Sequence, residues 1–146
     1  MGRDLLLSVE GLVAAVIALL LLFLLGTYLR RRAIARGRPL VLCAIRDPQE
    51  TRWKFGLARY GSSGLDWFRL GGVSVRPAYH WSRGRLDLEV PRRLEGADRL
   101  SILPEAIAVP CRHGDSNFEL ALAPASYTAL RSWLESSPPG LGVNVA

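Results

Sequence analysis

Residues 53–70 read WKFGLARYGSSGLDWFRL, and this stretch decides the fold of the larger part of the chain. Large apolar residues at positions 53, 55 and 57 alternate with small or charged ones, which is the two-residue period of a half-buried strand. GSSG at 61–64 supplies a four-residue turn, and the apolar pattern resumes at Leu65. The stretch therefore predicts an antiparallel hairpin with Trp53, Phe55 and Leu57 facing the core.

Strand-like segments continue on both sides of this hairpin. The sequence predicts further strands over 40–46, 73–79, 85–90, 107–112 and 118–122. The segment 85–90, RLDLEV, alternates most regularly, which places Leu86, Leu88 and Val90 inward and leaves Asp87 and Glu89 in solvent. Pro77 indicates an edge position or a strand end. Six or seven antiparallel strands follow from these patterns.

The apolar period changes after Pro124. Tyr127, Leu130 and Leu134 are spaced as on one face of a helix, with Trp133 beside them, and Pro138-Pro139 blocks continuation. The sequence thus predicts a helix over about 125–136. The predicted fold class is an N-terminal transmembrane helix plus a small antiparallel β domain, a pleckstrin-homology-like barrel or a sandwich, capped by a C-terminal α-helix. A split barrel or an α+β sandwich is the alternative. The likeness to pleckstrin-homology barrels concerns the fold alone and implies no ligand.

An uncharged run of 18 residues, from Gly11 to Tyr28, precedes the β domain. At about 1.5 Å per residue it is roughly 27 Å long, close to the hydrocarbon thickness of a bilayer. A cleaved signal peptide is disfavoured because the apolar core is long and no small-x-small cleavage site precedes the arginines. We therefore expect an extracytoplasmic N-terminus (1–10), a transmembrane helix (11–29), a basic juxtamembrane segment (30–39) and a cytoplasmic β domain (40–146).

The charge distribution gives the span a direction. The net charge of +6 divides into −1 for residues 1–29, +5 for 30–38 and +2 for the rest. Positive residues next to a span resist translocation, which predicts a single-pass plasma-membrane protein with the N-terminus outside. The same cluster is the predicted binding site for anionic phospholipid, at about 1 kcal/mol for each basic residue near the surface. Its members are Arg30, Arg31, Arg32, Arg36 and Arg38.

A second set of residues is predicted to face the membrane. Residues 40–93 carry +5 and residues 94–146 carry −3, so the first half of the domain is the basic half. Trp67 and Phe68 are adjacent and point to opposite faces of a strand, which leaves one exposed, and a tryptophan suits the membrane interface. The set comprises Arg52, Lys54, Arg59, Trp67 and Arg69.

No motif for catalysis or cofactor binding occurs in the chain. His113, Asp115 and Ser116 lie too close together in sequence for a hydrolase triad and are better explained as a turn. Cys43 and Cys111 lie in apolar strands and are expected to be buried thiols in a reducing compartment. Combined with His80 and His113, they lack the spacing of a structural zinc site. A charge of only +2 beyond the juxtamembrane segment argues against nucleic acid. We predict no enzyme activity, no cofactor and no metal.

Several short segments of the sequence resemble a known family. They are FGLARYGSSGLDWFRL (55–70), VRP (75–77), CRH (111–113) and WLESSPPGLGVNVA (133–146). Together they resemble an actinobacterial family of small single-span membrane proteins, the domain of unknown function 2550. The resemblance implies one span, an arginine-rich juxtamembrane segment and this domain, with no established activity or catalytic residues. It also implies a link with membrane energetics, because members tend to be encoded beside genes of the F-type ATP synthase.

The leading hypothesis from the sequence is a non-enzymatic, membrane-anchored cytoplasmic domain that binds the anionic membrane surface or a membrane-associated partner. The alternative is an accessory or assembly subunit of a membrane protein complex, which the resemblance links to the F-type ATP synthase. Gly11, Ala14, Ala15 and Ala18 place small residues at helical spacing on the span, as helix–helix contacts require.

Overall fold

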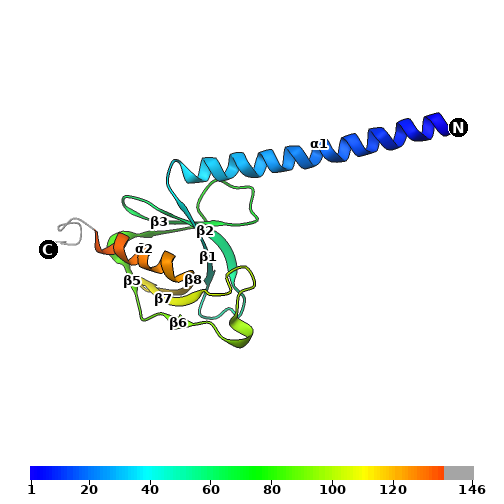
Figure 1. Ribbon diagram of the computed structural model, residues 1–146. Coiled ribbons are helices and arrows are strands. Elements are labelled where there is room, and N and C mark those ends of the chain that lie inside the picture. Colours follow the sequence, from blue (N-terminus) through cyan, green and yellow to red (C-terminus); the bar gives the residue numbers. More distant parts are fainter. Residues whose placement is uncertain (137–146) are drawn as a thin grey trace. The chain divides into compact units, whose positions relative to one another are not determined.

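The computed structural model describes residues 1–136 and divides the chain into two compact units, Met1–Gly37 and Arg38–Ala146 (Figure 1). The first unit is a single helix, and the second is a β domain with one further long helix. Residues 137–146 lie outside the described part of the chain. The predicted helix stop at Pro138-Pro139 and most of the tail 133–146 therefore lie there too.

The first unit is the helix α1, which runs from Gly2 to Ala35. Its 34 residues correspond to about 51 Å, more than the roughly 30 Å of a bilayer core. By length and composition it is the one described helix able to cross a membrane, and it lies near the N-terminus. The hydroxyls of Ser8 and Thr27 donate hydrogen bonds of 2.7 and 2.8 Å to backbone carbonyls of the helix, which satisfies them without an outside partner.

The end of α1 is set by two left-handed residues. Arg36 has φ 44° and ψ 41°, and its backbone N–H donates to the Arg32 carbonyl over 3.2 Å. Gly37 follows with φ 74°, a conformation that glycine adopts without steric cost. This arrangement satisfies one terminal carbonyl of α1 and stops the helix within the arginine-rich segment.

The second unit contains one eight-stranded antiparallel sheet. Its strands are β1 (Leu40–Arg46), β2 (Lys54–Tyr60), β3 (Gly64–Arg69), β4 (Tyr79–Ser82), β5 (Leu86–Leu88), β6 (Arg92–Arg93), β7 (Ile107–His113) and β8 (Ser116–Leu122). The spatial order is β4-β3-β2-β1-β8-β7-β5, with β6 pairing beside β5 on β7. The predicted hairpin is confirmed as β2 and β3, in which Leu57 pairs with Phe68.

The sheet curves until its two ends almost meet, which makes it a nearly closed barrel (Figure 1). The end strands β4 and β5 are joined by the short 3-10 helix η1 (Arg83–Arg85). Where strand pairing stops, the backbone N–H of Ser82 donates to Nε2 of His113, at the end of β7, over 3.1 Å. This side-chain contact therefore bridges the gap in the barrel wall, which we call the seam.

The barrel interior is filled by aromatic and aliphatic side chains from seven strands and from the C-terminal helix. Trp67 is its largest fully buried side chain. Its register partner on β2 is Ala58, and the indole ring lies over the neighbouring Gly56, where a Cβ would overlap it. Trp81 stacks on Phe118, with ring centroids 4.4 Å apart. These contacts define the main hydrophobic core.

A second core covers the outer face of the same sheet. Ala44, Ala108 and Ala121 present small side chains there, and the segment between β6 and β7, which includes the 3-10 helix η2 (Gly96–Asp98), packs on them. Trp53 and Phe55 belong to this outer cluster, so the prediction that they face the interior was wrong. Because both faces of the sheet are covered here, large apolar side chains occur on both of them and do not identify the inner face.

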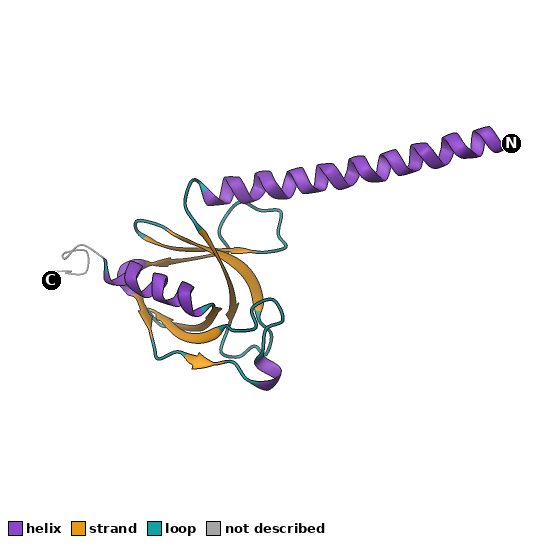
Figure 2. Cartoon of the chain, viewed as in Figure 1, coloured by secondary structure: helices purple, strands orange, loops and turns teal. Residues whose placement is uncertain are grey.

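The predicted C-terminal helix is confirmed as α2, from Pro124 to Glu135. Pro124 occupies its first turn, where the missing N–H has no cost. Leu130 is 2% exposed and belongs to the interior core, and Tyr127, Trp133 and Leu134 pack against that core at its edge. Figure 2 shows α2 lying against the curved sheet, as a cap on the barrel.

Two predicted strands differ from those observed. Residues 73–78 form no strand, and β4 begins only at Tyr79, because Pro77 has no N–H to donate to a neighbouring strand. The regular alternation of 85–90 produces only the three-residue β5, and Val90, expected inside, is 84% exposed. Pro91 follows it and cannot extend the pairing. The two-residue strand β6 was not predicted.

Candidate functional sites

The predicted basic cluster divides between the end of α1 and the residues that follow it. Arg31 and Arg32 lie exposed in the last turns of α1, and Arg30 is partly exposed. Arg36 and Arg38 are exposed as well, and Arg38 donates a long hydrogen bond of 3.4 Å to the Tyr60 carbonyl. Most of the cluster thus presents guanidinium groups to the surroundings, as binding to an anionic surface requires.

Two of the predicted membrane-facing cations are held by acidic residues. Lys54 Nζ lies 2.8 Å from the Glu50 carboxylate and 3.5 Å from that of Asp47. Arg59 lies 2.6 Å from Asp66, and its guanidinium covers the Phe68 ring at 5.1 Å from the centroid. Their charges are largely balanced within the domain. Arg52 and Arg69 are exposed.

Trp67 does not face a membrane, which corrects the prediction from the sequence. Its side chain is 0% exposed and lies in the barrel interior, while Phe68 is buried on the other face. The prediction assumed that one face of β3 is open, and in the structure both are covered. The indole is therefore part of the core.

An exposed apolar loop between β3 and β4 was not predicted. This segment, residues 70–78, is the β3–β4 loop. Leu70 is 40% exposed, Val75 51% and Val73 97%. Arg69 precedes the loop and Arg76 lies within it, and both are exposed. Apolar side chains flanked by arginines at a loop tip match the two chemical layers of a membrane surface, headgroup and hydrocarbon.

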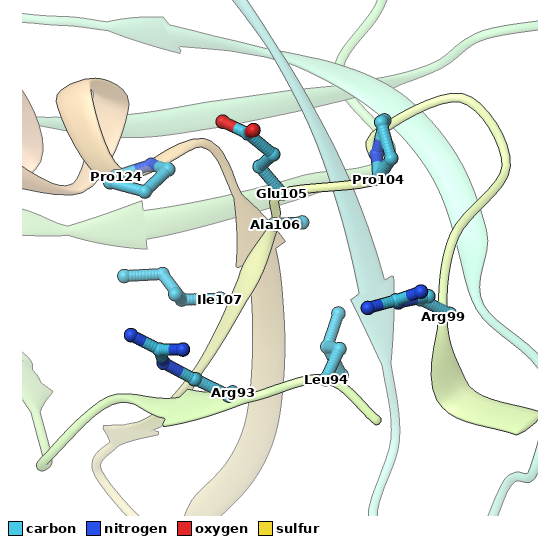
Figure 3. A pocket seen from close by; sticks show the side chains of 8 residues that line it. All are labelled: Arg93, Leu94, Arg99, Pro104, Glu105, Ala106, Ile107 and Pro124. Carbon is cyan, nitrogen blue, oxygen red and sulfur yellow. The ribbon is translucent and has the colours of Figure 1, made fainter. Parts of the chain in front are cut away.

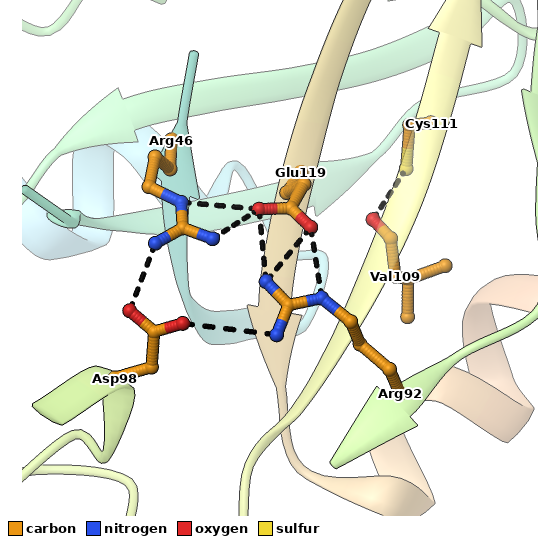
Figure 4. A network of polar contacts seen from close by, with 6 residues as sticks. All are labelled: Arg46, Arg92, Asp98, Val109, Cys111 and Glu119. Atoms are coloured by element: carbon orange, nitrogen blue, oxygen red, sulfur yellow. Dashed lines mark hydrogen bonds and ion pairs between the residues drawn. The ribbon is translucent and has the colours of Figure 1, made fainter. Parts of the chain in front are cut away.

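A network of four charged residues joins the outer face of the sheet to β6 and η2 (Figure 4). Arg46 donates from Nε to Glu119 over 3.0 Å and from a terminal nitrogen to Asp98 over 2.9 Å. Arg92 approaches the same two acids, at 3.0 Å from Glu119 and 3.7 Å from Asp98. Trp53 stacks under the Arg46 guanidinium, 4.4 Å from its carbon. Burial favours the neutral form of Arg46, but the two carboxylates outweigh it and raise its pKa. The network fastens the outer segment to the barrel.

The two histidines act as links between strands. His113 Nε2 accepts from the Ser82 backbone and lies 2.9 Å from Ser82 Oγ. His80 Nδ1 lies 2.6 Å from Asp66 Oδ1, beside the Arg59 pair. Burial favours the neutral form of Asp66, but hydrogen bonds from His80 and Arg59 outweigh it and lower the pKa of this carboxyl.

The cysteines are separate, buried thiols. Burial raises the pKa of both Cys43 and Cys111 to about 12. On β8, Cys43 pairs with Leu122 and Cys111 with Phe118, so the two are offset by about 13 Å along the strands, beyond disulfide reach. Within residues 1–136 no group of three or more His, Cys, Asp or Glu side chains is placed to hold a metal ion.

Comparison with known sequences places the chain in a family. The sequence model of the family described as "Protein of unknown function (DUF2550)" matches residues 16–140. The chain belongs to this family. No protein of curated function matches the DUF2550 chain. One similar solved structure is the C-terminal domain of an unknown protein from Leishmania infantum, at 15% identity and a TM-score of 0.46, covering 72% of this chain and 94% of that chain.

Two features of the DUF2550 domain could bind something outside the chain. One is the β3–β4 loop. The other is a cavity beside β6 that Arg93 and Arg99 line. In contrast, the Ser82–His113 pair and the Arg46 network are engaged in holding strands together.

Proposed function

We propose that this protein is a single-pass membrane protein whose β domain is not an enzyme, faces the cytoplasm and binds the anionic surface of the bilayer. The observation that carries the proposal is the β3–β4 loop, with Val73 97% exposed between Leu70 and Val75. Full burial of a valine side chain contributes about 1.5–3 kcal/mol, so insertion of the loop tip into the membrane is favourable.

Electrostatics support the same orientation of the loop. Arg69 and Arg76 flank its apolar residues, and a basic residue near an anionic surface contributes about 1 kcal/mol. The cluster Arg30–Arg38 adds further positive charge at the end of α1. Lys54 and Arg59 contribute less, because acidic neighbours already balance them. The excess of arginine after α1 also supports a cytoplasmic domain.

The architecture of the β domain supports a specific fold type. A strongly curved antiparallel sheet followed by one C-terminal helix, with Leu130 in the barrel interior, is the element order of the pleckstrin-homology type of barrel. We propose that fold type here. The assignment concerns architecture, and the membrane contact rests on the loop and the arginines.

A second candidate function is that of an accessory subunit in a membrane protein complex. Gly11, Ala14, Ala15 and Ala18 lie exposed on α1, at the spacing that lets transmembrane helices approach closely. In that case the apolar tip of the β3–β4 loop would contact a protein.

A dye on the loop tip distinguishes the two candidates. We expect Val73→Cys, labelled with an environment-sensitive dye in the full chain, to show a blue-shifted emission in nanodiscs that contain phosphatidylglycerol. The native thiols do not compete for the dye, because both are buried. The shift should shrink in discs of phosphatidylcholine alone. It should also shrink at high salt, because the screening length falls from about 10 Å at 0.1 M to about 3 Å at 1 M.

Matched variants complete the design. Ile102→Cys, at an exposed site between β6 and β7, should show no lipid-dependent shift. Arg69→Gln with Arg76→Gln should reduce the shift at Val73→Cys, whereas Arg112→Gln with Arg131→Gln, which removes the same charge elsewhere, should not. Identical emission from the loop dye in both kinds of disc and in detergent contradicts membrane binding and favours the protein-partner candidate.

A further inference from the structure

A cavity of about 400 Å³ opens between β6, the start of β7 and the first residue of α2 (Figure 3). This volume lies within the range of about 300–1,000 Å³ that is typical of small-molecule sites. Leu94, Ala106 and Ile107 give it an apolar floor, and Arg93, Arg99 and Glu105 supply its charged groups. The cavity therefore combines an apolar floor with a few charged groups.

The two arginines of this cavity have no acidic partner in the part of the chain that the structure describes. Among residues 1–136, neither Arg93 nor Arg99 forms an ion pair, whereas the adjacent Arg92 binds both Glu119 and Asp98. Arg92 and Arg93 are consecutive in β6, so their side chains leave the strand on opposite faces. In Figure 3, the guanidinium groups of Arg93 and Arg99 lie on either side of Leu94, and the Glu105 carboxylate points away from both.

The electrostatics of the cavity favour an anion with more than one charge. The lining contains two guanidinium groups and one carboxylate, so its net charge is positive. α2 begins at Pro124 on the rim, so the positive end of its dipole adds to the same sign. A guanidinium fork binds a phosphate through two parallel hydrogen bonds, and the attraction to a dianion exceeds that to a monocarboxylate.

We propose that this cavity binds a small soluble molecule that carries phosphate groups, held by Arg93 and Arg99 over the apolar floor. The site is separate from the β3–β4 loop, because no residue that lines the cavity belongs to that loop. The proposal does not depend on the loop binding lipid.

Pyrophosphate is a suitable first probe, used with the full chain in non-ionic detergent at constant ionic strength. We expect saturable binding in titration calorimetry and a rise in the thermal unfolding midpoint, with inorganic phosphate binding more weakly and acetate weakest. Arg93→Gln with Arg99→Gln should raise the half-saturating concentration at least tenfold. The control, Arg112→Gln with Arg131→Gln, loses the same charge at exposed sites outside the cavity and should change it less than twofold.

Glu105→Gln provides a test in the opposite direction. It keeps both arginines and removes the one acidic group of the cavity, so binding of pyrophosphate should strengthen about two- to threefold even if the double arginine variant folds poorly. A heat signal that does not saturate, an equal loss in the control, or weaker binding by Glu105→Gln would each overturn the proposal.

Discussion

His113 accepts the backbone N–H of Ser82 across the seam of the barrel only while its Nε2 is unprotonated. The Ser82 backbone N–H donates to that nitrogen, so the proton of the neutral ring resides on Nδ1. Burial lowers the pKa of His113, and the positive charge of Arg85 lowers it further. A protonated Nε2 can donate to Ser82 Oγ but can no longer accept from the Ser82 backbone N–H, so protonation removes one of the two contacts across the seam.

A pH dependence of stability follows from this residue. The unfolded chain binds a proton at His113 near pH 6.5, above the pKa of the folded state, so the unfolded state takes up more protons in that window. The contribution to stability is complete above pH 6.5 and is lost as the pH falls toward the lowered folded pKa. We expect denaturant unfolding of the full chain in detergent to show a smaller free energy of unfolding at pH 5.5 than at pH 7.5.

The variant His113→Gln isolates the effect. It removes the titrating group and should flatten the difference between the two pH values, at the cost of lower stability at neutral pH. Ser116→Ala, at the other side of the same turn, keeps His113 and should retain the slope. An unchanged slope in His113→Gln would assign the pH dependence to other groups.

At the scale of the elements, α2 caps the barrel and is anchored to it by one fully buried side chain. Leu130 lies in the interior core, and Trp133 adds a hydrogen bond of 3.0 Å from its indole N–H to the Gly61 carbonyl. Arg83 covers the Trp133 ring, 4.9 Å from its centroid, and bonds to the Trp133 carbonyl. Burial and these polar contacts fix the helix to the turn between β2 and β3.

The capping role can be measured by truncating that side chain. Leu130→Ala removes atoms from a closely packed core and leaves a cavity, so we expect it to lower the free energy of unfolding by about 2–5 kcal/mol. Ser132→Ala, on the exposed side of α2, should change it by less than about 0.5 kcal/mol. Chemical denaturation of both variants checks this, and a small effect of Leu130→Ala would mean that the cap is not needed for stability.

The elements also show how far the sequence predicts this fold. β1 and α2 were predicted nearly to the residue, because an apolar run between turn residues and a 3.6-residue period are local signals. The inner face of β2 was assigned wrongly, since Trp53 and Phe55 are covered by a segment, 94–106, that has no period of its own. The inner face of β2 carries small residues instead, because the Trp67 ring occupies the space beside Gly56.

The candidate sites were predicted unevenly for the same reason. The arginines after the span are contiguous in sequence, so their shared placement needed no fold. The exposed tip at Val73 and the cavity of Arg93 and Arg99 arise in segments 70–78 and 92–106, which form mostly loops. Contacts between distant segments, such as the ion pair of Arg92 with Glu119, decide which side chains in these loops are paired and which are exposed.

At the scale of the whole molecule, one long apolar helix precedes one β domain, and the charges beside the helix predict its direction in a membrane. Residues 30–38 carry +5, against −1 for residues 1–29. Because positive residues resist translocation, we expect the β domain in the cytoplasm. Cys43 and Cys111 cannot report this, since both are buried and their pKa is raised to about 12. Ile102, which is 54% exposed and lies outside the β3–β4 loop, offers a suitable reporter position.

The orientation is tested by labelling Ile102→Cys in cells with a membrane-impermeant maleimide. We expect no labelling in intact cells and full labelling after permeabilisation, while the unmodified chain should stay unlabelled in both because its thiols are buried. Replacing Arg30, Arg31, Arg32, Arg36 and Arg38 by Gln removes the charge that opposes translocation, so part of the Ile102→Cys population should then react in intact cells. Labelling of Ile102→Cys in intact cells with all five arginines present would place the β domain outside, where cytoplasmic phosphorylated molecules could not reach the Arg93 cavity.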